Sequence, residues 1–300
     1  MNTAGLAAAL GAVAIYAGMF AAGRAGAWDG LNGYDQTAIR FAVTTVLVLP
    51  FLWAALMPAA RRIGIGRLFA LFVLNGAPYS AVFLGGLVFA PVAYGAALVP
   101  GLQPVAVMVV ALLWRGQRPA LPNVLGAAIC LGGVLVMLLD RQVTGSTDLP
   151  IGIGLFLLAS AMWGTYTVAL KTWAIEPREA LATNAPLSAL LYLPVYLLWQ
   201  GPEAVLAAPA SAVLLQAVYQ GVLVGLVALI LFTVAVKTAG SAAVAALAPA
   251  IPVLATLIGW AVLGERPNGS QWAGLVIVTI GLLVGTLWPM LKARQQAMVA

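Results

Sequence analysis

The chain consists of long apolar stretches separated by short segments that hold its few charges. A helix that crosses a bilayer needs about 20 apolar residues, and stretches of this length recur along the whole sequence. They are apolar throughout and do not alternate with polar residues, which favours helices over the strands of a membrane barrel. The pattern therefore predicts an all-α integral membrane protein. We expect ten transmembrane helices, with boundaries good to about 2 to 4 residues, at 4–22, 36–57, 67–89, 92–114, 121–139, 151–171, 181–199, 210–236, 241–263 and 271–290.

The composition excludes a water-soluble domain. Of the 300 residues, 63% are hydrophobic and only 7% are charged, so too little polar surface exists to face solvent. The segments between the helices are too short to hold a soluble domain, and we expect function to lie among the helices, within the lipid bilayer. The first residues lack the basic segment of a signal peptide, so we interpret them as the first span. The single cysteine, Cys130, falls inside a span and is expected to be a small packing residue.

The basic residues are scattered through the loops, which argues against a nucleic-acid surface despite the net charge of +6. Their distribution instead predicts the topology, because cytoplasmic loops of membrane proteins are enriched in Lys and Arg. With the N-terminus in the cytoplasm, only Arg24, Arg40, Arg141 and Arg266 fall outside. Both termini are then cytoplasmic. The basic residues on the cytoplasmic side are Arg61, Arg62, Arg67, Arg115, Arg118, Lys171, Arg178, Lys237, Lys292 and Arg294.

The sequence also contains an internal repeat. The segment "GQRP" at 116–119 aligns with "GERP" at 264–267, at an offset of 148 (266 minus 118). We therefore expect two repeats, at 1–140 and 151–291. The same offset brings three further pairs together: Pro104 with Pro252, Gly126 with Gly274, and Gly133 with Gly281.

Each repeat holds five helices, and this odd number predicts that the two repeats are inverted relative to each other. The second copy must begin on the side of the membrane opposite to the first. Arg118 accordingly falls in a cytoplasmic loop and its counterpart Arg266 in an external one. Inverted repeats of this kind are a transporter architecture, in which two halves of like fold open a site near the bilayer midplane to each side in turn.

These motifs resemble those of a known family. The pair "RF" at 40–41, the stretch from Pro104 to "GQRP", and its second copy from Pro252 to "GERP" are similar to the EamA-type branch of the drug/metabolite transporter superfamily. The resemblance covers nearly the whole chain, but its motifs are short. The first copy has Gln117 where the family has Glu, which weakens any functional assignment of this position.

The resemblance implies export of small metabolites from the cytoplasm through the cell inner membrane. Amino acids are a common substrate class of the family, and the YddG-type aromatic amino acid exporters are the relatives that we would name first. The family is also expected to have a central cavity lined by both halves. No cofactor is implied.

Titratable groups are missing from the predicted membrane interior. The chain has no histidine, and every acidic residue maps to a loop or to the end of a span. A proton relay needs such a group within the bilayer, so we expect facilitated diffusion or exchange, with a proton carried by the substrate left open. The predicted spans also lack the side-chain combinations that intramembrane proteolysis and metal binding need. We therefore expect neither an enzyme nor a metal site. The acidic residues are Asp29, Asp35, Asp140, Asp148, Glu176, Glu179, Glu203 and Glu265.

The candidate substrate cavity consists of aromatic and amide side chains near the predicted midplane. Aromatic rings provide stacking surfaces, and hydroxyl and amide groups bind the polar end of a solute. The alternative is that the rings pack between helices, as we expect for Phe20 and Tyr94, and that the amides face partner helices. The candidate residues are Tyr16, Asn75, Tyr79, Gln103, Trp163, Tyr166, Tyr219 and Gln220.

Four prolines and one arginine have two possible roles each. Pro100 and Pro104 interrupt the fourth span, and Pro249 and Pro252 interrupt the ninth. A proline removes a helical hydrogen bond, so these positions are expected to be hinges beside the cavity or structural kinks. Arg40 lies one turn into the second span. We expect it to extend outward and pair with Asp35, the alternative being contact with a carboxylate at the outer gate.

Together these features predict an inner-membrane exporter of small metabolites that works by alternating access. Amino acids are the favoured substrates, hydrophobic or aromatic ones in particular. A transporter of another small solute, such as a sugar, a nucleotide derivative or a drug, is the first alternative. A membrane scaffold subunit that transports nothing is the second. No nucleic-acid partner is expected, and the sequence does not indicate an oligomeric state.

Overall fold

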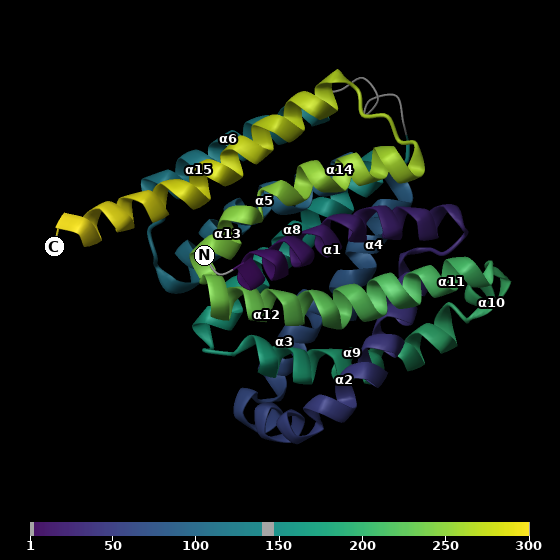
Figure 1. The fold of residues 1–300 in the computed structure, drawn as a ribbon. Helices are drawn as coiled ribbons and strands as arrows, with labels where there is room; N and C mark the ends of the chain where they lie inside the picture. Colours follow the sequence, from purple (N-terminus) through teal and green to yellow (C-terminus); the bar gives the residue numbers. More distant parts are fainter. Residues whose placement is uncertain (1–2, 140–146, 300) are drawn as a thin grey trace.

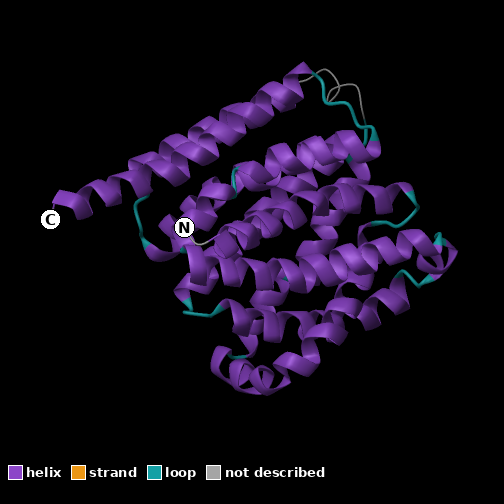
Figure 2. Ribbon diagram, viewed as in Figure 1, coloured by secondary structure: helices purple, strands orange, loops and turns teal. Residues whose placement is uncertain are grey.

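The computed structural model describes residues 3–139 and 147–299, and this part of the chain is helical with short connecting loops and no strand (Figure 2). Asp140 and Arg141, to which we assigned loop positions, lie outside the described residues. Eight described helices are long and apolar enough to cross a bilayer, or nine if the bent helix over residues 33–63 counts as one span. The prediction of a multi-pass, all-α membrane protein is therefore confirmed, whereas the number of ten spans stays a prediction.

The first half of the chain forms helices at the first five predicted spans. The third of these spans is divided in two by a break at Gly76, which the sequence analysis did not predict. The other spans each match one helix. The helices are α1 (Thr3–Trp28), α2 (Gly33–Ile63), α3 (Ile65–Asn75), α4 (Ala77–Phe89), α5 (Val92–Arg115) and α6 (Leu121–Leu138).

The second half follows the predicted pattern with two irregular spans. Around residue 220 the chain widens into a π-helical segment, and the 241–263 stretch is interrupted after Leu247. The helices are α8 (Leu149–Thr172), α9 (Pro177–Trp199), α10 (Glu203–Ala207), α11 (Ala210–Gln216), η1 (Ala217–Val227), α12 (Ala228–Ala239), α13 (Ser241–Leu247), α14 (Ala250–Leu263) and α15 (Gly269–Val299).

The break between α3 and α4 depends on a glycine and on polar side chains of α9. A Cβ atom at Gly76 would lie 2.5 Å from the Phe72 carbonyl oxygen and 2.5 Å from the Ser188 hydroxyl oxygen, so only glycine fits. The Ser188 hydroxyl accepts a hydrogen bond from the Ala77 backbone N–H (3.2 Å). Irregular backbone within a membrane requires such partners, because no water is available to replace the lost helical bonds.

Helices α6 and α15 lie side by side along one edge of the bundle (Figure 1) and touch through glycines. A Cβ atom at Gly126 would lie 2.7 Å from the Gly281 carbonyl oxygen, and one at Gly133 would lie 2.7 Å from that of Gly274. The two helices therefore touch backbone to backbone, the geometry that small residues permit in membranes. The buried Cys130 thiol donates to the Val278 carbonyl oxygen at 3.5 Å in the same interface, which confirms its predicted packing role.

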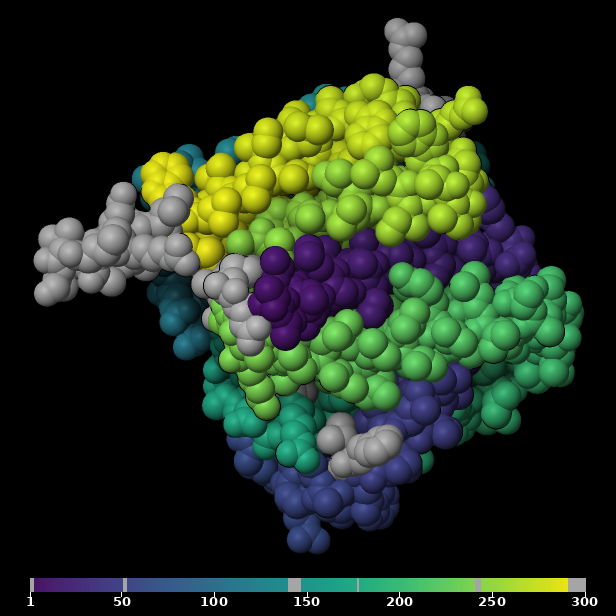
Figure 3. Space-filling view, in the orientation of Figure 1, coloured from purple at the N-terminus to yellow at the C-terminus, as the bar shows by residue number. Residues whose placement is uncertain are grey.

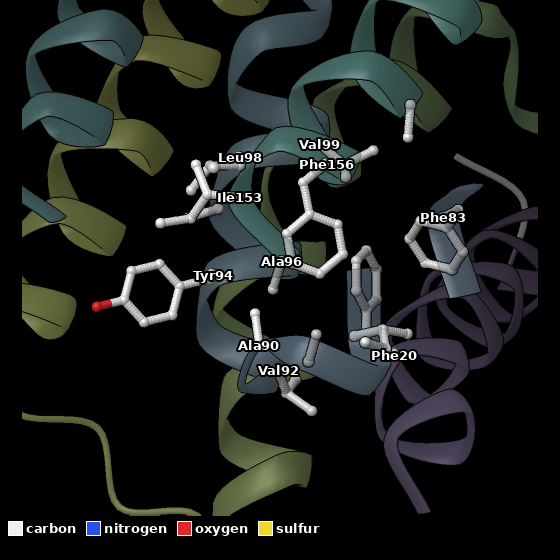
Figure 4. Close-up of a cluster of buried hydrophobic side chains, with 14 of the residues drawn as sticks. Phe20, Phe83, Ala90, Val92, Tyr94, Ala96, Leu98, Val99, Ile153 and Phe156 are labelled. Carbon is white, nitrogen blue, oxygen red and sulfur yellow. The ribbon is translucent and has the colours of Figure 1, made fainter. Parts of the chain in front are cut away.

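Helix α1 runs between α12 and α14 (Figure 1) and forms a strip of the surface on one face of the molecule (Figure 3). Its other side contacts α4, where Phe20 packs against Phe83. Phe156 of α8 joins these two rings, while the Tyr94 ring of α5 points away from them (Figure 4). These buried rings form the core that holds α1, α4 and α8 together.

Candidate functional site

A continuous series of aromatic rings crosses the bundle from α1 through α4 to α8. Phe20 meets Phe83 edge to face, with ring centroids 5.2 Å apart, and Phe83 stacks on Tyr79 at 6.2 Å. Tyr79 then contacts Trp163 at 5.4 Å, and Trp163 contacts Tyr166 at 5.9 Å. Three of the rings predicted to line a cavity, those of Tyr79, Trp163 and Tyr166, are thus brought together.

Polar side chains from three helices, α1, α2 and α3, converge on this series. The Arg40 guanidinium is near enough to the phenol groups of Tyr16 and Tyr79 for an electrostatic interaction with each. Tyr16 interacts in the same way with Tyr166, and the side-chain amide of Asn75 lies next to the Tyr166 hydroxyl.

We call this group the central cluster. Its members come from α1, α2, α3, α4 and α8. Four of its side chains are half-buried and so keep some accessible surface: those of Tyr16, Arg40, Asn75 and Trp163. Rings, hydroxyl groups, an amide and a guanidinium in one place can bind a small amphipathic solute. The central cluster consists of Tyr16, Arg40, Asn75, Tyr79, Trp163 and Tyr166.

The expectation that Arg40 extends outward and pairs with Asp35 is wrong. The Asp35 carboxylate is fully buried and has two other partners: it accepts from the Asn32 backbone N–H (2.9 Å) in the N-terminal cap of α2, and from the Tyr196 hydroxyl (2.8 Å). Arg40 instead interacts electrostatically with the phenol groups of Tyr79 and Tyr16, and Tyr16 lies near the midpoint of α1. Asp35 is unavailable because the start of α2 needs its carboxylate.

Three of the predicted cavity residues lie elsewhere. Tyr219 and Gln220 pack against α1, where the Tyr219 hydroxyl donates to the Ile15 carbonyl oxygen (3.3 Å) and the Gln220 amide to that of Met19 (3.2 Å). The half-buried Gln103 on α5 has no hydrogen bond within the described part of the chain. Tyr219 and Gln220 therefore form helix-packing hydrogen bonds, and none of these three residues has a ring contact or a hydrogen bond to a member of the central cluster within the described residues.

The four prolines differ between the two copies of the repeat. Pro100 and Pro104 lie inside α5, which continues through both of them. In the second copy the helix is interrupted after Leu247. Helix α14 then begins directly after Pro249 and has Pro252 in its first turn. Pro104 also lines a cavity of about 140 Å³ between α5, α6 and α15.

One end of the bundle is closed by a partly buried ion pair. The Arg24 Nε atom donates to Glu265 Oε1 at 2.8 Å, and its Nη1 atom donates to the carbonyl oxygens of Leu87 and Val88, each at 2.8 Å. The second oxygen of Glu265 accepts from the Val92 backbone N–H at 2.8 Å. The pair thus joins the "GERP" loop to α1 and to the turn between α4 and α5, beside a cavity of about 260 Å³.

This interaction is not among those predicted from the sequence. The first copy has Gln117 where the family has glutamate, which weakens a functional assignment of this position of the motif. The informative signal was Arg24 itself, a cation near the end of an otherwise apolar helix, which needs a partner on the same side of the membrane. In the structure Gln117 is exposed, and only the second copy of the motif closes an end of the bundle.

The opposite end carries the other ion pair of the described residues. Arg62 of α2 donates to Glu179 of α9, with the Nε–Oε1 distance at 2.8 Å. Glu179 also accepts from the Glu176 backbone N–H and so caps α9. This pair is more exposed, since the Arg62 side chain keeps 47% of its surface accessible, against 15% for Arg24.

Comparison with known proteins identifies the family. A family model described as the EamA-like transporter family matches residues 3–139 and 150–287. The chain is 25% identical over 224 residues to the protein named uncharacterized transporter YwfM from Bacillus subtilis (strain 168), an alignment covering 73% of each. A solved crystal structure with 20% sequence identity superimposes with a TM-score of 0.59 and covers 96% of this chain and 99% of its own, which supports the fold alone. The chain belongs to the EamA-like transporter family, a family of membrane transporters of small solutes.

Proposed function

We propose that this protein exports small metabolites from the cytoplasm across the cell inner membrane, with amino acids as the main substrate class. The central cluster is the observation that carries the proposal. Its rings favour hydrophobic or aromatic side chains, because aromatic pairs gain energy beyond that of simple burial. Its hydroxyl groups, amide and guanidinium match the polar end of the same molecules. An aromatic amino acid exporter of the YddG type is the finer form of the proposal.

Alternating access by two inverted repeats, at 1–140 and 151–291, is the proposed mechanism. In the sequence alignment Gly126 corresponds to Gly274 and Gly133 to Gly281. In the contact between α6 and α15, Gly126 meets Gly281 and Gly133 meets Gly274. Such reciprocal contacts are those expected when two like units are related by a two-fold axis, and they support an inverted repeat with ten spans.

The prolines are proposed to act as hinges in this movement. The interruption before Pro249 is a place where the second copy can bend, while the unbroken α5 keeps the first copy straighter. The described chain ends, in α1 and α15, lie toward the same side of the bundle (Figure 1). This arrangement supports placing both termini on the same side of the membrane, which the distribution of basic residues assigns to the cytoplasm.

We further propose that transport is facilitated rather than driven by protons. The central cluster contains no carboxylate and no histidine, and the buried carboxylate of Asp35 caps α2 and accepts from Tyr196. A proton-coupled carrier needs a group that gains and loses a proton within the membrane. The phenol groups of the cluster ordinarily titrate far above neutral pH.

Reconstitution into proteoliposomes tests the proposal. We expect saturable counterflow of labelled L-phenylalanine, with a KM that rises about tenfold in Trp163→Ala through loss of stacking. Trp53→Ala is the matched control, because Trp53 is exposed at 61% and should leave KM unchanged. Competition by a sugar or a nucleotide derivative but not by amino acids would favour another solute. Absence of any saturable flux would favour a scaffold subunit.

The same vesicles test the coupling. Facilitated transport predicts that counterflow is the same with and without an imposed pH gradient. Accumulation of L-phenylalanine driven by the gradient would contradict it.

A further inference from the structure

Arg40 is the one charged side chain of the central cluster, and it has no acidic partner. Within the described residues it forms neither an ion pair nor a hydrogen bond, and its guanidinium carbon lies 5.8 Å from the centroid of the Phe41 ring. Protein surrounds it closely, although part of its surface stays accessible. A cation in a membrane protein interior is costly unless an anion or strong acceptors compensate it.

The groups around Arg40 do not provide that compensation. Its electrostatic partners are the phenols of Tyr16 and Tyr79, which are neutral at physiological pH. Asp35, the acidic residue five positions earlier on α2, is committed to the helix cap and to Tyr196. The central cluster therefore carries a net charge of +1 and several groups that can donate hydrogen bonds, which is the environment that an anionic group requires.

We propose that Arg40 binds the carboxylate of the transported solute. This inference rests on the proposed function and names the chemistry of its site. A guanidinium presents two parallel N–H donors that match the two oxygens of a carboxylate. Trp163 and Tyr79 lie in the same cluster and offer rings for the apolar part of the solute.

A phosphate group fits the site less well. Phosphate esters carry a charge of about −2 near neutral pH, and the central cluster holds a single cation among its described residues. One carboxylate would neutralise the cluster, whereas a phosphate would leave excess negative charge in the membrane. The inferred solutes are therefore small carboxylates that bear an apolar or aromatic group, including zwitterionic amino acids.

Competition against labelled L-phenylalanine in proteoliposomes tests the proposal. In the unmodified protein, L-phenylalaninamide and phenethylamine should inhibit at least about tenfold more weakly than L-phenylalanine, because both lack the carboxylate. Inorganic phosphate should not compete. In Arg40→Gln the KM for L-phenylalanine should rise at least about tenfold, and the difference between acid and amide should disappear. Arg40→Lys should recover part of the discrimination.

Arg61→Gln is the matched control, because Arg61 is an exposed arginine on the same helix. Equal inhibition by acid and amide in the unmodified protein would overturn the proposal, as would discrimination retained in Arg40→Gln or strong competition by phosphate. If Arg40→Gln does not fold, Arg40→Lys and the competition series on the unmodified protein decide the question.

Thermal stabilisation of the purified protein separates this proposal from the proposed transport function. Stabilisation by L-phenylalanine but not by its amide, lost in Arg40→Gln, would support the carboxylate site even if no flux were measured. Flux without any dependence on the carboxylate would support transport and reject the role of Arg40.

Discussion

Two arginines of the first half, Arg24 and Arg40, have opposite surroundings. Arg24 at the end of α1 has its charge matched by Glu265 and two further donor positions filled by backbone carbonyl oxygens. Arg40, deeper in the bundle, faces neutral phenols and has no acidic partner in the described structure. Both are cations in an apolar helix bundle, yet only one of them is compensated by the protein.

This difference separates a structural charge from one available to a ligand. A compensated arginine joins parts of the chain, as Arg24 joins α1, the turn after α4 and the "GERP" loop. An uncompensated one lowers the stability of the empty protein and is stabilised by whatever anion it binds. Substitutions can give Arg40 a carboxylate partner, as Arg24 has, or remove the carboxylate partner of Arg24, as in Arg40.

The largest effect is expected when Arg40 is given an internal partner. Tyr79→Glu places a carboxylate beside the guanidinium, which should occupy the site in the way that Glu265 occupies Arg24. Tyr79→Gln removes the same ring without adding charge and is the matched control. We expect L-phenylalanine counterflow in Tyr79→Glu to be lower than in Tyr79→Gln by at least about tenfold.

The folded state provides a second readout for this pair of variants. The new ion pair should keep Tyr79→Glu at least as stable as Tyr79→Gln in detergent, so loss of transport would not reflect unfolding. Equal counterflow in the two variants would contradict the role assigned to Arg40.

An intermediate effect is expected when Arg24 loses its partner. Glu265→Gln removes the negative charge that compensates the partly buried Arg24, which should lower the free energy of unfolding by about 1–3 kcal/mol. The midpoint of thermal unfolding in detergent measures this loss. Discrimination between L-phenylalanine and its amide should stay unchanged, and a change in it would place Glu265 in substrate recognition.

The smallest effect is expected at the exposed pair of the opposite end. The Arg62 side chain is 47% accessible, so solvent screens its attraction to Glu179. Arg62→Gln should therefore lower stability by no more than about 0.5 kcal/mol. A loss as large as that of Glu265→Gln, measured by the same unfolding midpoint, would show that exposure does not separate the two pairs.

The positions of the helices could be predicted from the sequence because lipid requires long apolar stretches. The breaks within them were harder to predict, since each depends on a tertiary contact. The Gly76 break relies on Ser188, more than a hundred positions later in the chain. The segment "NGAP" at 75–78 does contain a local signal, a glycine closely followed by a proline.

The composition of the site was predicted in part. Tyr16, Asn75, Tyr79, Trp163 and Tyr166 share the central cluster because they lie at similar depths in neighbouring helices. Depth alone does not reveal which way a side chain faces. The sequence therefore also places Tyr219 and Gln220 among the candidate cavity residues, although both pack on α1 in the structure.

Arg40 was assigned the wrong partner for a different reason. Sequence proximity favoured Asp35, but Asn32 and Asp35 have the spacing of a helix N-terminal capping box. That spacing is visible in the sequence itself, and it indicates that the Asp35 carboxylate is engaged at the start of α2 and is not free to pair with Arg40.

Protection of a single cysteine in the central cluster tests most directly whether carboxylates bind there. The chain has one cysteine, so Asn75→Cys in a Cys130→Ala background places the only thiol in the cluster. Its rate of modification by a membrane-permeant maleimide is then measured with L-phenylalanine and with L-phenylalaninamide. We predict that the acid slows the modification, that the amide does not, and that Arg40→Gln abolishes the protection. Equal protection by both compounds, or protection that survives Arg40→Gln, would contradict carboxylate binding at Arg40.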